Sequence, residues 1–380
     1  MKGFVVVCSG APQTSGMSLA AEHVCCFLKK KGLSGEAIWL PSLNRREKEV
    51  FASFFTFLKI PLKYVAVLQK IVFGKQDCCY FVVGQSWWSW IREVIPLSVI
   101  RFKNPEFFVV ALHGSWFLNW PKDSFKFKCF RWLINRGKAV AVLGPKSKTA
   151  LQESGVSSHL VSVINRPDFE LGESDRLLHY SCCDDSSLTF LFLSNLSEAK
   201  GYSVFLDAIV RLYEKYSDKM PQCRFLMVGD LIRPKHSVAE ASFKDSFQSV
   251  SKRLEAIRRL GGTVEWLGSV SDKEQKRSLF TRSDVFVFPS EVECQPLVLI
   301  EAMAERCAII TTCVGEIPWM LPKDTCVFIK PSDSQELAER LFFLSIDRSR
   351  IRVLQERSLK RYKEFFCPQK WEEQWSGLLF

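Results

Sequence analysis

Several patterns that would assign this 380-residue chain to a common class of protein are missing. No C-x-x-C spacing occurs among the fourteen cysteines, and six of them form adjacent pairs. This pattern predicts free thiols in a reducing compartment rather than a zinc site or a disulfide framework. No G-x-G-x-x-G follows the first apolar run, so a dinucleotide fingerprint is not supported. Internal repeats and low-complexity runs are also absent.

The sequence lacks a long uninterrupted apolar run as well. The first apolar run, Phe4 to Val7, is too short for the core of a signal peptide. The longest apolar stretch, residues 50–73, is interrupted by three lysines, a proline and a glutamine, so it does not predict a membrane span. We expect a cytoplasmic protein, with peripheral contact to the inner membrane face as a further expectation.

The charge that is present is unevenly distributed. Residues 1–166 contain 23 Lys and Arg against 9 Asp and Glu, whereas residues 167–380 contain 29 against 32. This asymmetry predicts a polyanionic partner or an anionic membrane surface for the first half. Phenylalanines beside lysines in residues 50–73 suit an interfacial helix on anionic lipid, and the alternative is an amphipathic helix pair packed on a sheet. Three tryptophans between Trp87 and Trp90 predict an acceptor site or a membrane interface there.

Strand and helix patterns alternate through both halves, which predicts parallel α/β sheets in two domains. We expect an N-terminal Rossmann-like domain at residues 1–167 and a polar linker at 168–187. A second Rossmann-like domain is expected at 188–361. The remaining residues, 362–380, have the apolar face of a helix that returns to the first domain.

The most informative stretch runs from residue 284 to residue 316. It predicts a buried strand, Val285 to Phe288, an acidic loop, a helix from Leu297 to about residue 305 and a second strand. Pro296 is expected as the first helical residue, where its missing N–H has no intrahelical partner to lose. The helix is apolar almost throughout, and Glu301 interrupts it.

Two glutamates eight positions apart suggest a ligand. A lone carboxylate in an apolar helix, such as Glu301, is costly unless it is hydrogen-bonded or paired, and a hydroxyl-rich ligand would satisfy it. Glu293 lies at the helix mouth, where free N–H groups favour an anion such as a diphosphate, so its carboxylate would face sugar hydroxyls. The alternative is a loop glutamate and a helix glutamate on a solvent-exposed face.

This stretch resembles the donor-site signature of family 4 retaining glycosyltransferases with the GT-B fold. The matching residues are Pro289, Ser290, Glu293, Pro296, Glu301, Ala302, Met303 and Ala304. Cys294-Gln295 stands where the family has Gly-Phe, and Gly315-Glu316 stands where it has Gly-Gly. The resemblance implies two Rossmann-like domains whose parallel sheets face a central cleft, with the C-terminal helix crossing back to the first domain.

The resemblance also implies roles for individual residues. Glu301 would bind the ribose hydroxyls of a UDP- or GDP-sugar, Glu293 the donor sugar, and Lys200 with Asn195 the diphosphate. His113, from a His-Gly pair after an apolar strand, would approach the donor sugar, although a core histidine is the alternative. The other expected donor-site residues are Gly16 in the first loop, Val270 under the base, and Cys294, Gln295, Pro296 and Leu297 at the helix mouth.

Together these features predict transfer of a hexose or N-acetylhexosamine to a glycan or lipid-linked glycan. No carboxylate is placed as a covalent nucleophile, so front-face transfer is favoured over double displacement. No Asp-x-Asp motif occurs, so we expect neither a metal nor a cofactor. Three alternatives stay open: a sugar-nucleotide epimerase or phosphorylase, a glycosyltransferase acting on nucleic acid, and a catalytically silent binding subunit.

Overall fold

The computed structural model describes most of the chain and divides it into two compact units. The described residues are 3–9, 16–40, 65, 68, 69, 73, 78–84, 87–103, 108–114, 116–135, 137–157, 159–167, 187–232 and 238–380. The N-terminal unit comprises residues 1–166 and 368–380, and the C-terminal unit comprises residues 167–367. Most of residues 50–73, where helices are expected, and most of the linker at 168–187 fall outside the described residues.

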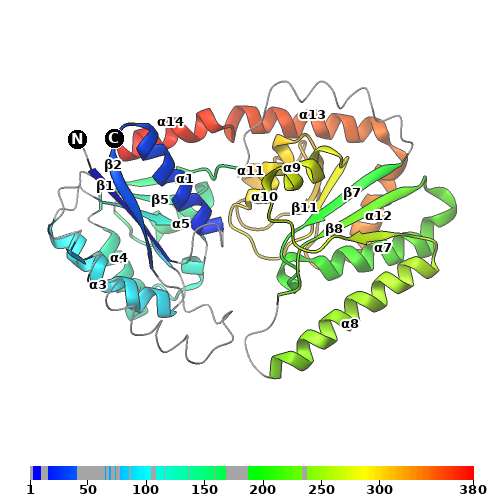
Figure 1. Cartoon of the computed structure of the whole chain (residues 1–380), viewed down its shortest axis with the longest axis horizontal. Helices are drawn as coiled ribbons and strands as arrows, with labels where there is room; N and C mark the ends of the chain where they lie inside the picture. Colours follow the sequence, from blue (N-terminus) through cyan, green and yellow to red (C-terminus); the bar gives the residue numbers. More distant parts are fainter. Residues whose placement is uncertain are drawn as a thin grey trace. The chain divides into compact units, whose positions relative to one another are not determined.

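The N-terminal unit contains a six-stranded parallel sheet in the order β2-β1-β3-β4-β5-β6 (Figure 1). Its strands are β1 Gly3–Ser9, β2 Ser34–Leu40, β3 Cys78–Val82, β4 Phe108–Leu112, β5 Ala139–Leu143 and β6 Leu160–Val163. Its helices are α1 Gly16–Lys30, α3 Trp87–Lys103, α4 Phe125–Ile134, α5 Pro145–Glu153 and α14 Pro368–Leu379, with the short η2 Trp116–Asn119.

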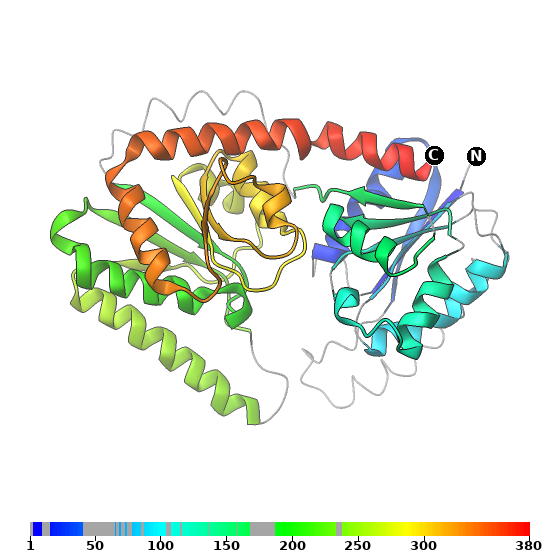
Figure 2. The same cartoon turned by 180° about the vertical axis from the view of Figure 1, so that it is seen from behind.

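Alternate strand residues pack against different helices. Val110 and Val142 share a core with Leu97 of α3, Phe127 and Phe130 of α4, and side chains of α5. This arrangement places α3, α4 and α5 on one face of the sheet, and Figure 2 shows α3 and α4 together on that side.

The last helix of the chain packs within the N-terminal unit. Trp371 of α14 lies edge-on to Phe27 of α1, with ring centroids 5.4 Å apart, and Trp375 lies 5.3 Å from Tyr80 of β3. The terminal segment of this unit begins at Pro368, whereas the sequence places the start of the returning helix at residue 362.

The C-terminal unit contains the second six-stranded parallel sheet, in the order β12-β11-β10-β7-β8-β9. Its strands are β7 Leu188–Leu193, β8 Cys223–Val228, β9 Val264–Trp266, β10 Val285–Phe288, β11 Ala308–Thr312 and β12 Val327–Ile329. Its helices are α7 Tyr202–Tyr216, α8 Val238–Arg259, α9 Lys273–Thr281, α10 Leu297–Ala304, α11 Ile317–Met320, α12 Ser334–Ile346 and α13 Arg348–Phe365, with the short η3 Glu198–Lys200 and η4 Ser217–Lys219.

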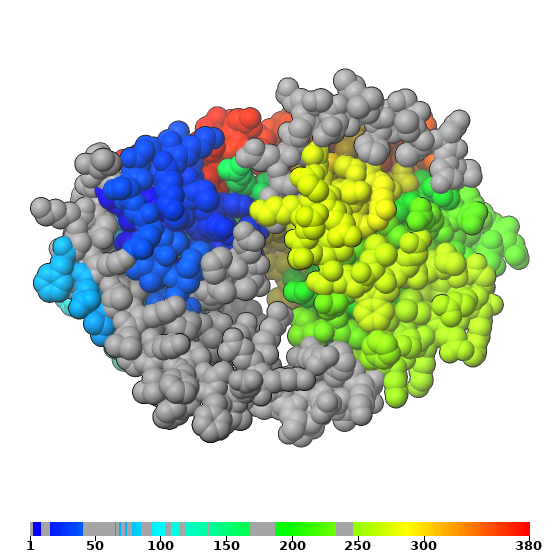
Figure 3. Space-filling model, in the orientation of Figure 1, coloured from blue at the N-terminus to red at the C-terminus, as the bar shows by residue number. Residues whose placement is uncertain are grey.

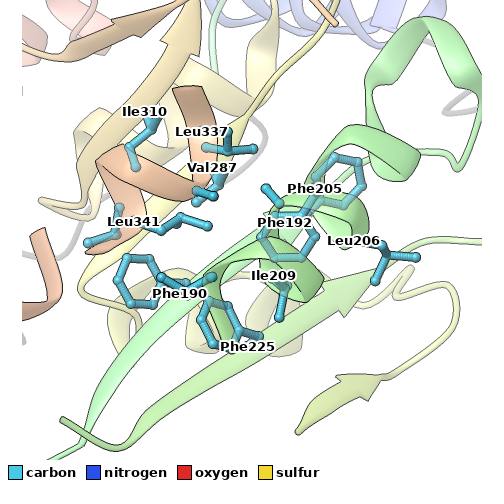
Figure 4. Close-up of a cluster of buried hydrophobic side chains, with 14 of the residues drawn as sticks. Phe190, Phe192, Phe205, Leu206, Ile209, Phe225, Val287, Ile310, Leu337 and Leu341 are labelled. Atoms are coloured by element: carbon cyan, nitrogen blue, oxygen red, sulfur yellow. The ribbon is translucent and has the colours of Figure 1, made fainter. Parts of the chain in front are cut away.

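Local sequence explains where these helices begin, and aromatic packing explains the core. Asp272 caps α9 by accepting a hydrogen bond of 2.7 Å from the backbone N–H of Gln275. Between β7, α7 and β8, Phe190 stacks on Phe225 at 5.2 Å and Phe192 on Phe205 at 5.4 Å (Figure 4). Aromatic pairs at this spacing add to the stability that burial provides.

Two further expectations can be checked in the described part of the chain. The cysteines there are free thiols, as the sequence predicts. Among the described helices, none is long and apolar enough to cross a bilayer.

Candidate functional site

The candidate donor site lies at the carboxyl edge of the C-terminal sheet. From β7 the chain continues through β8 to β9 on one side, whereas β10, β11 and β12 extend the sheet on the other side. The strand order therefore reverses between the neighbouring strands β7 and β10, and ligands of open α/β sheets bind at such a point. Lys200 lies at the end of η3 in the connection after β7, and Glu293 lies in the loop after β10.

Lys200 and Glu293 form an ion pair at this point, through Nζ and Oε1. The same carboxylate oxygen accepts a hydrogen bond of 3.0 Å from Ser290 Oγ. The Glu293 side chain is 7% exposed and the Lys200 side chain 32% exposed, so the ammonium group is the part of the pair more open to solvent. The structure thus brings together two residues that the sequence separates by more than ninety positions.

Backbone contacts hold the two loops against each other. The N–H of Glu291 donates to the carbonyl of Ala199 at 2.9 Å, and Ser290 Oγ donates to the same carbonyl at 2.9 Å. Gly201 has φ +75°, and a Cβ there would lie 2.1 Å from the carbonyl oxygen of Pro289. Because only glycine fits this close approach, Gly201 fixes the position of Lys200.

The loop after β11 closes the other side of the acidic loop. Gly315 has φ +57°, and a Cβ there would lie 2.2 Å from the carbonyl oxygen of Glu293. The N–H of Glu316 donates to the carbonyl of Cys294 at 2.9 Å. Gln295 and Glu316 are buried, and Cys294 is partly buried. The residues that depart from the family signature therefore pack within the loop structure.

Helix α10 begins one residue later than the sequence suggests. Pro296 has extended backbone angles, φ −68° and ψ 122°, and precedes the first helical residue, Leu297. The expectation that Pro296 is the first helical residue is therefore wrong by one position. The N–H groups of the first turn of any helix lack intrahelical partners, so the mouth of α10 offers donors to an anion.

Glu301 is fully buried in α10 and paired on one oxygen. Its Oε1 lies 2.5 Å from Nζ of Lys276 in α9. Its Oε2 is buried and has no hydrogen-bond partner among the described residues. A buried carboxylate oxygen without a partner is costly, and a hydroxyl donor from a ligand would remove that cost.

Lys276 was not anticipated from the sequence. The sequence does predict its helix, with a Lys-Glu-Gln-Lys-Arg run before Asp284, but nothing in that pattern indicates which side chain faces α10. A second pair joins the same helices, Arg277 Nε to Glu305 Oε1 at 2.9 Å. Consecutive residues of α9 thus pair with carboxylates one turn apart on α10.

Three other expected donor-site residues of this unit lie in or after loops of the same sheet. Asn195 is exposed in the connection after β7, and no described residue hydrogen-bonds to its side chain. Val270 is partly buried in the loop after β9, two strands from β7. Leu297 is partly buried at the start of α10. The distances from Asn195, Val270 and Leu297 to a donor are not defined, so their roles stay predictions.

The two expected residues of the N-terminal unit have different surroundings. His113 follows β4, and its Nε2 lies 2.6 Å from the hydroxyl of the fully buried Tyr80. Burial lowers the pKa of His113 to about 4, and a hydrogen bond with Asn165 acts in the opposite direction. His113 is therefore neutral at pH 7, and Tyr80 and Asn165, its partners, belong to its own unit. Gly16, expected in a loop, is instead the first residue of α1.

Within the described residues, no three His, Cys, Asp or Glu side chains come together as a metal site would require. The expectation of metal independence is not tested by this and stays a prediction.

The two six-stranded parallel sheets in Rossmann-like units define the GT-B fold. The chain is similar over its whole length to sucrose-phosphate synthase from Thermosynechococcus elongatus, with a TM-score of 0.72, 16% identity and coverage of 100% of this chain and 98% of that one. It is also similar to Anabaena Alr3699/HepE in complex with UDP-glucose, with a TM-score of 0.68, 16% identity and coverage of 100% and 99%.

Sequence comparison gives the family. Residues 187–347 match the family model "Glycosyl transferases group 1", and the chain therefore carries a domain of this family in its C-terminal unit. One relative is the phosphatidylinositol N-acetylglucosaminyltransferase gpi3 subunit of Schizosaccharomyces pombe, 29% identical over 154 residues. The match covers 40% of this chain and 29% of that protein, so the chain matches less than a third of that relative's length. The resemblance found in the sequence is confirmed at the level of this family.

Proposed function

We propose that this chain is a retaining glycosyltransferase. It would move a hexose or N-acetylhexosamine from a nucleotide-diphosphate sugar to a glycan or lipid-linked glycan. The observation that supports the proposal most directly is the Lys200–Glu293 pair at the strand-order reversal, beside the mouth of a helix whose buried Glu301 has an unpartnered oxygen.

The charges of the site suit a diphosphate as leaving group. Lys200 is the more exposed partner of its ion pair, so a bound diphosphate would attract its ammonium group. The N–H groups at the mouth of α10 would share the negative charge that develops as the glycosidic bond breaks. Glu293 would then be released to accept a hydroxyl of the donor sugar, and Glu301 Oε2 would accept a ribose hydroxyl.

Attack from the same face as departure is the mechanism we propose. Glu293, the carboxylate of the pair, is engaged by both Lys200 and Ser290, which makes it a poor covalent nucleophile. With Lys200 and the helix mouth stabilising the leaving group, the diphosphate itself could accept the proton of the acceptor hydroxyl. A metal is not required by this arrangement, so added chelator should leave the rate unchanged.

The names of similar proteins support the substrate classes. HepE was crystallised with UDP-glucose, which favours a UDP-sugar as donor. The gpi3 relative is named for transfer to phosphatidylinositol, which favours a lipid-linked acceptor.

A binding screen followed by one substitution tests the proposal. Thermal unfolding is measured with UDP-, GDP- and ADP-sugars, and one of these should raise the melting temperature. With that donor, Glu293→Gln should keep nucleotide binding and reduce turnover by about a hundredfold or more, the effect expected for an electrostatic group at a reacting centre. The anomeric configuration of the product, read by NMR, reports retention.

Glu291→Gln is the matched control, because Glu291 lies in the same loop but is exposed and contacts Ser332. Its turnover should stay within about twofold of the wild-type value, which is the size of effect expected for a surface change. Unchanged turnover in Glu293→Gln, or an equal loss in Glu291→Gln, would remove the assigned role of Glu293.

A further inference from the structure

Two helices of the N-terminal unit expose large apolar side chains on the same face of the unit. Ile95 and Phe102 of α3 are 61% and 71% exposed, and Phe125 and Trp132 of α4 are 80% and 44% exposed. We call these four residues the α3–α4 aromatic surface. Contiguous apolar groups on a folded surface mark a site of contact with a protein or a membrane.

The spacing of these residues makes one continuous surface. In each helix the two residues are seven positions apart, which is two turns, so they share one side of the helix. The stripes meet where the rings of Phe102 and Trp132 lie 5.8 Å apart. The Arg101 guanidinium lies 4.0 Å from the Trp132 ring centroid and donates to the Trp132 carbonyl, which ties the helices together.

The domain core does not require these side chains. Helix α4 buries a different set on its inner side, Phe127, Phe130 and Leu133, each at most 2% exposed. Leu97 is the corresponding buried residue on the inner side of α3. Figure 1 shows both helices at the outside of the sheet, and in Figure 3 atoms of α3 lie at the molecular surface. The outer aromatic residues thus add little to the stability of the unit.

Helix α4 places positive charge beside this surface. Helix α4 contains Lys126, Lys128 and Arg131 and no acidic residue. The only acidic residue of α3, Glu93, is fully buried and accepts a hydrogen bond of 2.7 Å from the N–H of Gly84. The exposed Lys128 lies between Phe125 and Trp132 in α4, and the exposed Asp123 precedes that helix.

We propose that the α3–α4 aromatic surface docks on an anionic lipid bilayer. Aromatic side chains insert at the level of the headgroups, and lysines between them pair with anionic lipids. The strongly positive balance of residues 1–166 adds long-range attraction to the same partner. A surface whose helix α4 carries three cations and no acid fits a negatively charged bilayer better than a second copy of this chain, whose α4 is also cationic.

Vesicle binding tests the proposal without donor or acceptor, so its failure is separate from failure of the proposed transfer activity. The intact chain is sedimented with vesicles of phosphatidylcholine and phosphatidylglycerol at 7:3 and with pure phosphatidylcholine. We expect binding to the anionic vesicles and a loss when salt is raised, because screening weakens the lysine contribution.

Substitutions then locate the contact. Phe125→Ser and Phe102→Ser should each weaken binding about tenfold by removing an inserted ring. Lys128→Glu should weaken it about fivefold or more, from the loss of one cation near the lipid. Phe343→Ser is the matched control, because Phe343 is 53% exposed on α12 of the other unit, and its binding should equal that of the wild type.

Three results would overturn the proposal. The first is no sedimentation of the wild type with anionic vesicles. The second is equal loss in Phe125→Ser and Phe343→Ser. The third is a concentration-dependent dimer in sedimentation velocity that Phe102→Ser dissociates, because the surface would then be occupied by a second copy. Near-ultraviolet circular dichroism confirms that each variant is folded.

Discussion

The pairing of Lys276 with Glu301 leads to a prediction that links stability to ligand binding. Glu301 is 0% exposed, and Lys276 Nζ is the only partner that the described residues provide for its carboxylate. Lys276→Met removes that partner and leaves a buried carboxylate with no compensation. Breaking one side of a buried ion pair costs about 3–5 kcal/mol, so α9 and α10 should be destabilised by an amount of this order.

The second arm of the prediction removes the charge itself. Lys276→Met combined with Glu301→Gln leaves no buried charge, so the double variant should be more stable than Lys276→Met alone. The two residues are in contact, and their effects should therefore be non-additive by about 1–3 kcal/mol. A chain of two units can unfold in more than one step, so amide hydrogen exchange of α9 and α10 is the appropriate measurement.

Nucleotide affinity separates the ligand role of Glu301 from its structural role. If the unpartnered Oε2 accepts a ribose hydroxyl, Glu301→Gln loses a hydrogen bond to a charged group, worth about 1.5–3 kcal/mol. That corresponds to a fall in affinity of about ten- to a hundredfold in calorimetric titration.

The neighbouring pair, Arg277 and Glu305, provides the control. It joins the same two helices at 2.9 Å, with side chains 13% and 5% exposed. Arg277→Met and Glu305→Gln should therefore reduce protection of α9 and α10 and leave nucleotide affinity unchanged. Equal nucleotide affinity in Glu301→Gln and the wild type would refute the assignment. So would an equal loss of affinity in Glu305→Gln, because the effect would then be structural.

Three further predictions concern single residues. The pKa of His113 is about 4 in the folded chain and near 6.5 in the unfolded chain. The contribution of this neutral histidine to the free energy of unfolding is therefore complete above pH 6.5. It should fall by about 3 kcal/mol as the pH drops to 4, and His113→Gln should flatten this acid dependence of unfolding. Gly201→Ala should cost at least about 2 kcal/mol, because it adds a clash with Pro289 to left-handed strain, whereas Gly261→Ala, at φ +82° with nothing nearby, should cost about 1 kcal/mol. Lys200→Met should weaken binding of a nucleoside diphosphate more than that of the free nucleoside, and equal losses would contradict its placement at the phosphates.

The elements of the C-terminal unit could be predicted closely from the sequence. Strand β10 has the expected bounds, and both ends of helix α10 lie within one residue of the expected positions, because the strand is a short apolar run and a proline precedes the helix. Local signals of this kind do not depend on the rest of the fold. That Lys200 and Glu293 belong to one site was expected from the family resemblance, and the structure places them in contact.

Contacts between elements could not be predicted in this way. Lys276 and Glu301 meet because α9 and α10 pack side by side, and helix packing depends on all the side chains between them. The hydrogen bond between His113 and Tyr80 likewise joins the end of β4 to the interior of β3. A polar residue at the end of a strand can face outward or inward, and the sequence pattern is the same in both cases.

The departures from the family signature bear on whether the chain is a silent subunit. The carbonyl of Cys294 accepts a hydrogen bond from the N–H of Glu316, and this contact joins the acidic loop to the loop after β11 through the backbone. Glycine is kept at position 315, where φ is positive and a Cβ would collide with the loop. Glu316 has φ −93°, which any L-residue adopts, so the second glycine is not needed there. The replacement of the second glycine by Glu316 therefore leaves intact the backbone that positions Glu293.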